Sequence, residues 1–554
     1  MMIRLVINRV ISAMMNVSFC FAVIVTVSVL VCTTNGAPGP NIPDIEKDPQ
    51  YWNDLAKRSI MKRFGVLQNN NKAKNVILFV GDGMGPTTVT AARILRGQSM
   101  GMPGEETELE FEKFPNVALS KTYNIDRQTA DSAGTATAFL SGVKTNYFVI
   151  GLDSRSIALD CESQHGTEVE TIADWAAAAG KKTGIVTTSR ITHATPASAY
   201  AHAADRYWEG DVDTQSITGG CRDIAQQLVD DNKHFNVLLG GGRRTFLPNT
   251  TRDPEYNTIH SKHRLDGRNL IKEWQDDKQN RSYSSAFVWN KKQFDEVDPY
   301  NTQYLMGLFE PNHMQYELDR DTTDNGEPSL AEMTKKAIQI LQQGDEGFFL
   351  LVEGARIDHA HHDGLAQKAL VETLMLEDAV KEALKLTNTE DTLIIVTADH
   401  SHVFDIAGYA YRGTDIFGLV EPVDPTEDTT DKKPYSVLYY GNGPNYQEPR
   451  QNLSEVDMHD KDFAFPAGVP MPWETHGGED VAIYADGPMS HLFNGVQEQN
   501  YIAHVMAYAM CVGPYSYDCR RPSDKVCVGS AGSLAFLPVM YLLVIALIVK
   551  TISC

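Results

Sequence analysis

Three short apolar runs share one design along this chain. The runs are NVILFVGDG (75–83), GFFLLVEGARIDH (347–359) and TLIIVTADH (392–400). Each has the length and side-chain branching of a strand covered on both faces. Each is followed by or ends in an acid, namely Asp82, Glu353 and Asp399. A single acid after a strand often only starts a turn, whereas three such acids indicate a shared purpose.

Helical patterns lie between strand-like runs. Residues 166–184 precede the strand-like IVTT, and residues 330–344 precede FFLLV. Alternation of strands and helices predicts an α/β fold with a largely parallel central sheet, flanked by helices on both faces. Ligands of such sheets bind beyond the carboxyl ends of the strands. If the three strands are neighbours, their acids converge on one edge.

Residues from about 405 to 475 differ in character from the rest. They are rich in Gly, Pro, Asp and Tyr, and their periodicity is weak. This pattern predicts an inserted subdomain or long loops over the site, and ordinary surface connections are the alternative.

Composition indicates a globular protein that does not bind nucleic acid. The chain has 554 residues, of which 42% are hydrophobic, and a formal net charge of −23. Nucleic acids are bound through clustered Lys and Arg, so an acidic chain is an unsuitable partner. An excess of acids fits either solubility or the binding of several cations.

The start of the chain resembles a targeting segment. Arg4 and Arg9 precede an apolar run over 17–31, and small residues follow. This pattern predicts a secretory signal peptide over 1–36, and an N-terminal membrane anchor is the alternative.

The end of the chain predicts a lipid anchor. Residues 533–554 are almost entirely apolar, and small residues precede them. We expect 530–554 to be a GPI-anchor signal that is removed, with Ser523, Gly529 or Ser530 as the attachment residue. A spanning helix of ~20 residues is the alternative. The mature domain would then cover 37–520 at the extracellular face of the cell membrane.

A secreted route permits disulfides and glycans. The expected disulfide pairs are Cys161 with Cys221 and Cys511 with Cys519, while Cys527 is left over. Sequons predict surface glycosylation at Asn249, Asn280 and Asn452.

Acids and imidazoles gather in three motifs that suit metal ions. In RIDHAHHDG (356–364), Asp358 and His362 are four apart and share one face of a helix. His476 stands before a glycine pair, where a lone histidine would be an ordinary surface residue. Carboxylate and imidazole suit zinc, whereas magnesium prefers oxygen. Two zinc ions with three side chains each would use Asp82, Asp358, His362, Asp399, His400 and His476, leaving Glu353 and a shared Asp82 for magnesium.

Two further residues suit phosphate chemistry. Ser132 in TADSAGTATAFLSG (129–142) stands at the start of a helix-forming stretch, where backbone N–H groups attract anions. Taken alone, such a serine is more often a cap. Arg206 in HAADRYW could hold two phosphate oxygens, or could be a packed surface residue.

Five motifs occur along the chain in this order: FVGDGMG, TADSAGTATA, VEGARIDHAHH, TADHSHVF and THGGEDV. Together they resemble the motifs of the animal membrane-bound (GPI-anchored) alkaline phosphatases. The similarity covers roughly residues 45 to 515. It implies an alkaline-phosphatase-like fold, a homodimer whose N-terminal helix at about 48–65 reaches the partner, and a crown-like subdomain at 405–475 at the dimer interface.

The resemblance also implies a role for each matching residue. Ser132 corresponds to the serine that becomes phosphorylated, and Arg206 to the phosphate clamp. The implied metal ligands are Asp358, His362 and His476 for one zinc, Asp82, Asp399 and His400 for the other, and Asp82, Thr195 and Glu353 for magnesium. The residues implied near the metals are His193 and His402. A calcium site is implied at Glu255, the backbone of Phe309, Glu310 and Glu327, where Glu327 lies beside an apparent short insertion, Asn325–Gly326.

The implied reaction is hydrolysis of small phosphate monoesters with broad specificity, through a phosphoserine at a site with two zinc ions and magnesium. A phosphodiesterase or sulfatase is the first rival. A sulfatase would need a cysteine nucleophile, which 129–142 lacks, and a diesterase would favour threonine at position 132. The second rival is a non-catalytic receptor on the same scaffold, which loss of a metal ligand would support.

Overall fold

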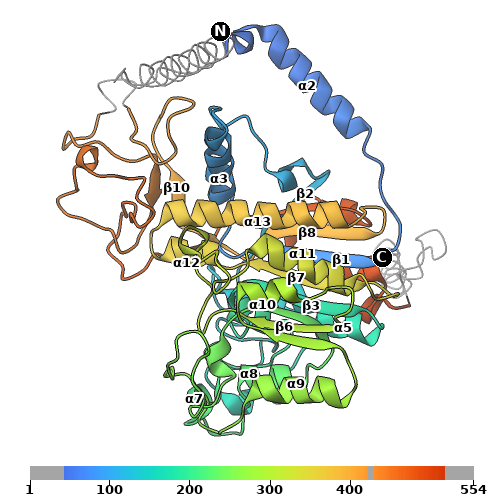
Figure 1. Ribbon diagram of the computed structural model, residues 1–554. Coiled ribbons are helices and arrows are strands. Elements are labelled where there is room, and N and C mark those ends of the chain that lie inside the picture. Colours follow the sequence, from blue (N-terminus) through green and yellow to red (C-terminus); the bar gives the residue numbers. More distant parts are fainter. Residues whose placement is uncertain (1–42, 422–427, 518–554) are drawn as a thin grey trace, which may run out of the picture.

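A ten-stranded sheet forms the centre of the molecule in the computed structural model, which describes residues 43–421 and 428–517. The strand order is β14-β2-β13-β8-β1-β7-β3-β4-β6-β5 (Figure 1). Only β13 runs antiparallel to its neighbours in this sheet. The predicted α/β fold with a largely parallel sheet is therefore confirmed. The strands are β1 (Asn75–Gly81), β2 (Asn116–Lys121), β3 (Lys182–Arg190), β4 (Phe235–Gly241), β5 (Ser285–Val288), β6 (Tyr304–Leu308), β7 (Phe348–Gly354), β8 (Thr392–Ala398), β13 (Val481–Asp486) and β14 (Val496–Glu498).

The three predicted apolar runs are β1, β7 and β8, and they are adjacent in the sheet. Every residue of these strands is buried, as expected for parallel strands that are covered on both faces. Their central position is what brings the residues at their carboxyl ends together.

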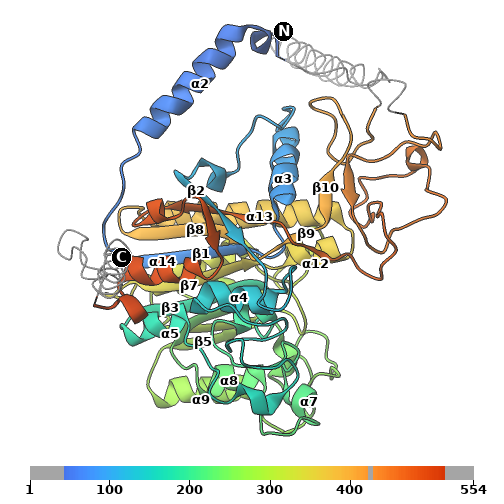
Figure 2. The same cartoon turned by 180° about the vertical axis from the view of Figure 1, so that it is seen from behind.

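Helices cover both faces of the sheet. In Figure 1, α11 and α13 lie across the near face, and Figure 2 shows α4, α5 and α14 on the opposite face. The helices are α2 (Pro49–Phe64), α3 (Pro86–Ser99), α4 (Ser132–Ser141), α5 (Ile172–Ala178), α6 (Ala194–Ala197), α7 (Asp211–Thr214), α8 (Ile224–Asp230), α9 (Leu270–Asn280), α10 (Lys291–Glu296), α11 (Leu330–Leu341), α12 (Arg356–His362), α13 (Ala366–Leu386) and α14 (Tyr501–Met510).

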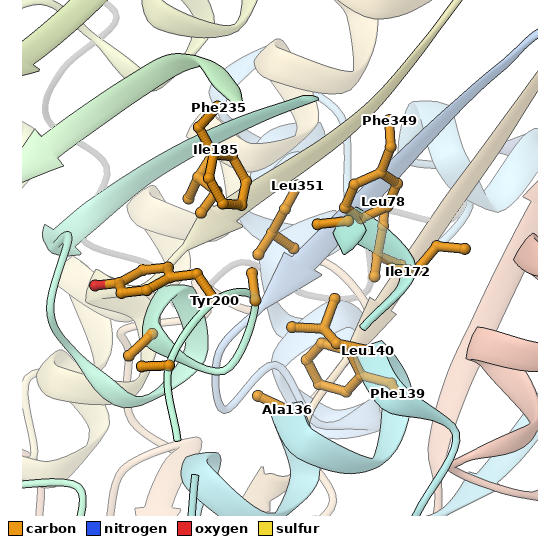
Figure 3. Packing of buried hydrophobic residues seen from close by; sticks show 14 of the residues in the cluster. Leu78, Ala136, Phe139, Leu140, Ile172, Ile185, Tyr200, Phe235, Phe349 and Leu351 are labelled. Atoms are coloured by element: carbon orange, nitrogen blue, oxygen red, sulfur yellow. The ribbon is translucent and has the colours of Figure 1, made fainter. Parts of the chain in front are cut away.

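Each face of the sheet has its own apolar core. On the α4 face, Phe139 and Leu140 of α4 and Ile172 of α5 pack in one cluster with Leu78 and Leu351 of the strands (Figure 3). All five side chains are fully buried. Burial of an aliphatic or aromatic side chain of this size contributes roughly 1.5–3 kcal/mol, so these contacts hold α4 firmly against the sheet.

Residues 404–475 contain little regular structure in their described part. Two short antiparallel pairs accompany them: β10 (Phe404–Ile406) with β11 (Leu438–Tyr440), and β9 (Ser401–His402) with β12 (His476–Gly477). The weak sequence periodicity of this segment agrees with its many loops.

Both predicted terminal signals lie outside the described residues. These are the signal peptide at 1–36 and the anchor signal at 530–554, together with the three candidate attachment residues. Within 43–421 and 428–517, no helix combines the length and apolarity that crossing a bilayer requires.

Candidate active site

The carboxyl ends of β1, β7 and β8 bring three acids to one edge of the sheet. Asp82 follows β1 and Asp399 follows β8, whereas Glu353 lies inside β7, one residue before its end. The strand register sets the last residue of β1 opposite the last residues of both neighbours. The sequence pattern predicts that Glu353 follows the end of its strand, whereas in the structure it is the second-last residue of β7.

Asp82, Asp399 and His400 form one compact group. One potential ligand atom from each lies within 4.8 Å of the others. Burial and the neighbouring carboxylates raise the pKa of Asp82 well above its usual range, and burial lowers the pKa of His400. Neither carboxylate oxygen of Asp82 has a hydrogen-bond partner in the described residues. A buried, unpartnered carboxylate is costly unless a cation accompanies it.

Asp358, His362 and His476 form a second group. Helix α12 places Asp358 and His362 on one face, and the Nε2 atoms of His362 and His476 each lie 3.3 Å from Asp358 Oδ1. Their Nδ1 atoms donate to the carbonyl oxygens of Glu474, at 2.6 Å, and Ala130, at 2.7 Å. In neutral rings this leaves two Nε2 lone pairs facing each other at 3.1 Å. Ligating histidines have this outward donation and inward lone pair.

His402 links the second group to a carboxylate that the sequence analysis missed. Its Nε2 lies 2.8 Å from Asp358 Oδ1, and its Nδ1 contacts Glu474 Oε2. Burial opposes the charged form, but Glu474 and Asp358 together raise the pKa of His402 to about 10. The proximity of Glu474 to His476 in the sequence is the only signal for it.

Glu353, Asp82 and His193 form a third group within 4.8 Å. Ser189 Oγ donates to Glu353 Oε2 at 3.2 Å, while Glu353 Oε1 and the Thr195 hydroxyl are buried without a partner in the described residues. Burial raises the pKa of Glu353 to about 7. The carboxylates of Glu353 and Asp82 and the hydroxyl of Thr195 are oxygen donors, which suit a hard cation.

Ser132 opens α4 but is not its cap. The cap is Asp131, whose side chain accepts from the backbone N–H groups of Ala133 at 3.3 Å and Gly134 at 3.4 Å. Because Asp131 caps the helix, the ordinary explanation of Ser132 as a cap does not apply. Ser132 Oγ is buried and lies 3.3 Å from His400 Nε2, beside the first group.

Arg206 is held beside Ser132 by an acid that the sequence analysis did not single out. Its Nη1 donates to Asp131 Oδ2 at 3.1 Å, and its Nη2 to His193 Nε2 at 3.2 Å. The side chain is only 10% exposed. A buried, oriented guanidinium suits the binding of two phosphate oxygens.

A separate set of acids surrounds the expected calcium position. Burial, then Glu255, raises the pKa of Glu310 to about 7, and burial, then Glu310, raises the pKa of Glu327 to about 9. Arg243 Nη2 neutralises part of this charge by donating to Glu255 Oε2 at 2.9 Å. Phe309 is buried and follows β6 directly.

The structure confirms one of the two predicted disulfides and gives the exposure of the three predicted glycosylation sites. Cys161 and Cys221 are disulfide-bonded, as predicted. Cys511 is disulfide-bonded, but Cys519 lies outside the described residues, as does Cys527, so the second pairing stays a prediction. Of the sequons, Asn249 and Asn280 are exposed and Asn452 is half-buried.

Comparison with known proteins decides the family. The sequence model of the alkaline phosphatase family matches residues 73–512. The chain belongs to the alkaline phosphatase family. It is 48% identical over 517 residues to the tissue-nonspecific isozyme of alkaline phosphatase from Homo sapiens, covering 92% of this chain and 95% of that protein. It is 49% identical over 479 residues to alkaline phosphatase from Gadus morhua, covering 85% and 99% respectively.

Solved bacterial alkaline phosphatases share the fold. The enzyme from the Antarctic bacterium TAB5 superposes with a TM-score of 0.55 at 24% identity, covering 79% of this chain and 99% of that one. The enzyme from Thermus thermophilus gives 0.57 at 22% identity, covering 80% and 92%. As an alkaline phosphatase the chain is a phosphomonoester hydrolase, and this assignment replaces the sulfatase and phosphodiesterase alternatives. Its grouped acids and histidines are candidate metal ligands.

Proposed function

We propose that this alkaline phosphatase hydrolyses phosphate monoesters of broad structure through a phosphoserine at Ser132, in a site for two zinc ions and one magnesium ion. The facing lone pairs of His362 and His476, 3.1 Å apart, carry the proposal. When both rings are neutral, each donates its Nδ1–H to a carbonyl oxygen, so no hydrogen bond joins the two Nε2 atoms. A shared cation is the arrangement that satisfies both.

The donor chemistry supports the division of the metals. Pairs of imidazole and carboxylate donors suit zinc, whereas the oxygens of Asp82, Thr195 and Glu353 suit magnesium. One zinc would be held by Asp358, His362 and His476, the other by Asp82, Asp399 and His400, and magnesium by Asp82, Thr195 and Glu353. Bound metals would supply Lewis-acid stabilisation of negative charge on the attacking and leaving oxygens.

The chain's own residues supply the nucleophile and the clamp. Ser132 Oγ, having lost its proton to solvent, forms a bond to phosphorus while the bond to the leaving oxygen breaks and that oxygen takes up a proton from water. A second water molecule then hydrolyses the phosphoserine, which releases inorganic phosphate and restores the serine hydroxyl. Arg206, oriented by Asp131 at 3.1 Å, donates to the non-bridging oxygens as charge develops on them. The N-terminal N–H groups of α4 add a positive potential at the same place.

Trapping the covalent intermediate tests this function. Wild-type enzyme incubated with p-nitrophenyl phosphate and quenched in acid should yield a phosphorylated peptide containing Ser132, detected by tandem mass spectrometry. The Ser141 of the same helix is the internal control, and it should remain unmodified. Turnover without any phosphopeptide, or phosphate on another residue, would contradict the assignment.

We also propose that Glu255, the backbone of Phe309, Glu310 and Glu327 hold a calcium ion. Mutual repulsion and burial raise the carboxyl pKa values of Glu310 and Glu327, which a bound cation would reverse. Oxygen ligands from side chains and backbone are those that calcium takes.

The remaining proposals concern the chain's surroundings. We infer a secreted, GPI-anchored and glycosylated ectoenzyme, with residues 1–36 and 530–554 removed, a mature domain over 37–520, and a crown-like insertion at 405–475. The exposure of Asn249 and Asn280 supports glycosylation. The identity of 48% to an animal isozyme over 92% of the chain supports a shared organisation.

A homodimer is supported by the N-terminal helix. Helix α2 has no buried residue and extends away from the body (Figure 1). Large apolar side chains at positions eight and four residues apart on this helix are exposed, with Trp52 at 51%, Ile60 at 59% and Phe64 at 82%. An apolar stripe of this kind marks a surface that another protein covers. We infer that a second copy of the chain covers it.

Shortening the chain tests the dimer. Deletion of residues 43–66 should convert a dimer to a monomer at micromolar concentration, as measured by light scattering after size-exclusion chromatography. The triple substitution Trp52→Ala, Ile60→Ala and Phe64→Ala should weaken the dimer, whereas Lys57→Ala on the same helix should not. An unchanged dimer in the deletion variant would show that α2 is not part of the interface.

A further inference from the structure

One histidine of α12 lies next to the second metal group without belonging to it. His361 is fully buried, and in the sequence it stands between Asp358 and His362. Helix α12 has only seven residues, fewer than two helical turns, and a helix of that length is marginal without tertiary contacts. The contacts of its buried side chains therefore decide how the helix is rotated about its axis.

Both ring nitrogens of His361 contact buried hydroxyl groups. Nε2 lies 3.0 Å from Thr88 Oγ1, and Nδ1 lies 2.9 Å from the hydroxyl oxygen of Tyr440. Thr88 and Tyr440 are each only 1% exposed. A neutral imidazole has one donor and one acceptor, and a hydroxyl can act as either, so each tautomer satisfies both contacts. The three side chains form a hydrogen-bonded connection, which we name the His361 bridge.

The His361 bridge connects elements that lie next to both metal groups. Thr88 is in α3, which begins shortly after Asp82 of the first group. Tyr440 is in β11, which pairs with β10, and β10 begins just after His402. Both overall views show α3, β10 and α12 at the same end of the molecule (Figure 1, Figure 2). One buried side chain therefore ties these three parts of the chain together.

Backbone and ring contacts hold Tyr440 firmly in place. Its backbone N–H donates to the Pro466 carbonyl and its carbonyl accepts from the Gly468 N–H, both at 3.0 Å. The ring centroid of Phe404 lies 5.0 Å from that of Tyr440 and 4.8 Å from that of His361. Aromatic rings at these separations pack favourably, and the Phe404 side chain is buried. The hydroxyl of Tyr440 is thus a fixed point to which His361 is attached.

The rotation of α12 matters because Asp358 and His362 have to meet the same ion as His476. His476 comes from β12, so it does not move with the helix. Metal-binding side chains are held within roughly 0.5 Å of the productive geometry by neighbouring contacts. If α12 turned about its axis, both of its proposed ligands would shift together relative to His476. The two hydrogen-bonded contacts of the His361 bridge oppose such a rotation.

We propose that Tyr440 is a positioning residue for the zinc ion of the second group, acting through His361 on the orientation of α12. The inference rests on the proposed function, because that zinc ion is assigned there. It gives the 404–475 segment a part in metal binding, through a side chain that acts on the ligands only by way of His361. The alternative is that the buried bridge stabilises the fold and leaves zinc affinity unchanged.

Zinc affinity distinguishes these alternatives. The full-length enzyme is dialysed against a series of buffers of fixed free zinc concentration, and plasma mass spectrometry counts the bound zinc. Tyr440→Phe removes only a hydroxyl, and it should raise the free zinc concentration that half-fills one of the two zinc sites about tenfold, leaving the other site unchanged. Loss of a partner that orients a metal ligand lowers affinity about 10-fold to 100-fold, and a contact that acts through the helix belongs at the lower end.

Two further variants locate the effect. Thr88→Val removes the hydroxyl on the other side of His361 with little change in volume, and it should weaken binding of the same zinc ion. Because both variants act through His361, the double variant should lose less affinity than the product of the two single losses. Tyr439→Phe is the matched control, since it makes the same chemical change at the neighbouring residue of β11, whose side chain is 36% exposed. Its zinc binding should match that of wild type.

Thermal unfolding of the metal-free variants separates positioning from stability. A melting temperature that falls in Tyr440→Phe while both zinc affinities stay those of wild type overturns the inference and leaves the bridge purely structural. An equal loss of zinc affinity in Tyr439→Phe overturns it too. If Tyr440→Phe does not fold, Thr88→Val carries the same test by the same criterion. A wild-type enzyme that binds no zinc refutes the proposed function instead, so the two failures are distinguishable.

Discussion

Replacing Ser132 with alanine is expected to lower kcat for p-nitrophenyl phosphate on the order of 10³-fold or more, without lowering the melting temperature. The expected loss is large because Ser132 is the proposed nucleophile and alanine has no hydroxyl that could form the covalent intermediate. The fold should survive because Asp131, not Ser132, caps α4, and its side chain keeps its contacts with the N–H groups of Ala133 and Gly134. Removal of the Oγ atom breaks only its contact with His400 Nε2 at 3.3 Å.

Ser141→Ala in the same helix is the matched control. Its hydroxyl is buried and donates to the Thr137 carbonyl at 2.6 Å, so the change removes a serine of similar burial that is remote from the acids. It should keep near-wild-type turnover. Steady-state kinetics with thermal unfolding of each variant separate the two effects. Full activity in Ser132→Ala would refute the nucleophile, and a melting temperature that falls with the activity would attribute the loss to folding.

The acids at the sheet edge can be predicted from sequence because one geometric rule applies. Adjacent parallel strands end at the same edge, so Asp82, Glu353 and Asp399 converge if their strands are neighbours. Their neighbourhood itself cannot be read from sequence, since the order β8-β1-β7 depends on non-local packing. Helical spacing likewise predicts Asp358 beside His362, which α12 realises at 3.3 Å.

Strand ends and helical spacing do not predict residues that reach the site through tertiary contacts. His476 arrives because β12 pairs with β9 in a register that sets it opposite His402, and strands of two residues have no periodicity to detect. Glu474 is buried behind His402, and Asp131 is buried behind Arg206. The burial and the contacts that indicate a role for these residues are known only from the folded structure.

Removal of the metals is expected to abolish turnover and to destabilise the protein more at pH 8.5 than at pH 5.5. Burial raises the pKa of Glu353 to about 7 and the pKa values of Asp82 and Asp399 above their usual range. An acid whose pKa is higher in the folded state holds its proton there while the unfolded chain has lost it. The contribution of these acids to stability is therefore greatest below their unfolded pKa values of about 3.9 to 4.3, and it is lost as pH rises through the folded values. Between its unfolded and its folded pKa, each such acid lowers the free energy of unfolding by about 1.4 kcal/mol per pH unit.

Bound cations should cancel this dependence, because they stabilise the ionised carboxylates. The melting temperature of the metal-loaded enzyme should therefore vary little across the window, while that of the chelated enzyme falls, and the gap between them widens with pH. Plasma mass spectrometry of the loaded enzyme should count two zinc ions and one magnesium ion per chain, and their return should restore hydrolysis of p-nitrophenyl phosphate.

Asp82→Asn separates charge from shape in this experiment. The substitution keeps the volume of a side chain whose two oxygens have no partner in the described residues, but it removes one buried charge. At pH 8.5 the metal-free variant should be more stable than metal-free wild type, although it binds less metal and turns over more slowly. A metal-free variant that is less stable than wild type would mean that Asp82 is held by contacts other than a cation. Repulsion among uncompensated carboxylates is expected to destabilise the metal-free protein at high pH. A less stable variant would therefore assign these buried acids a structural role instead.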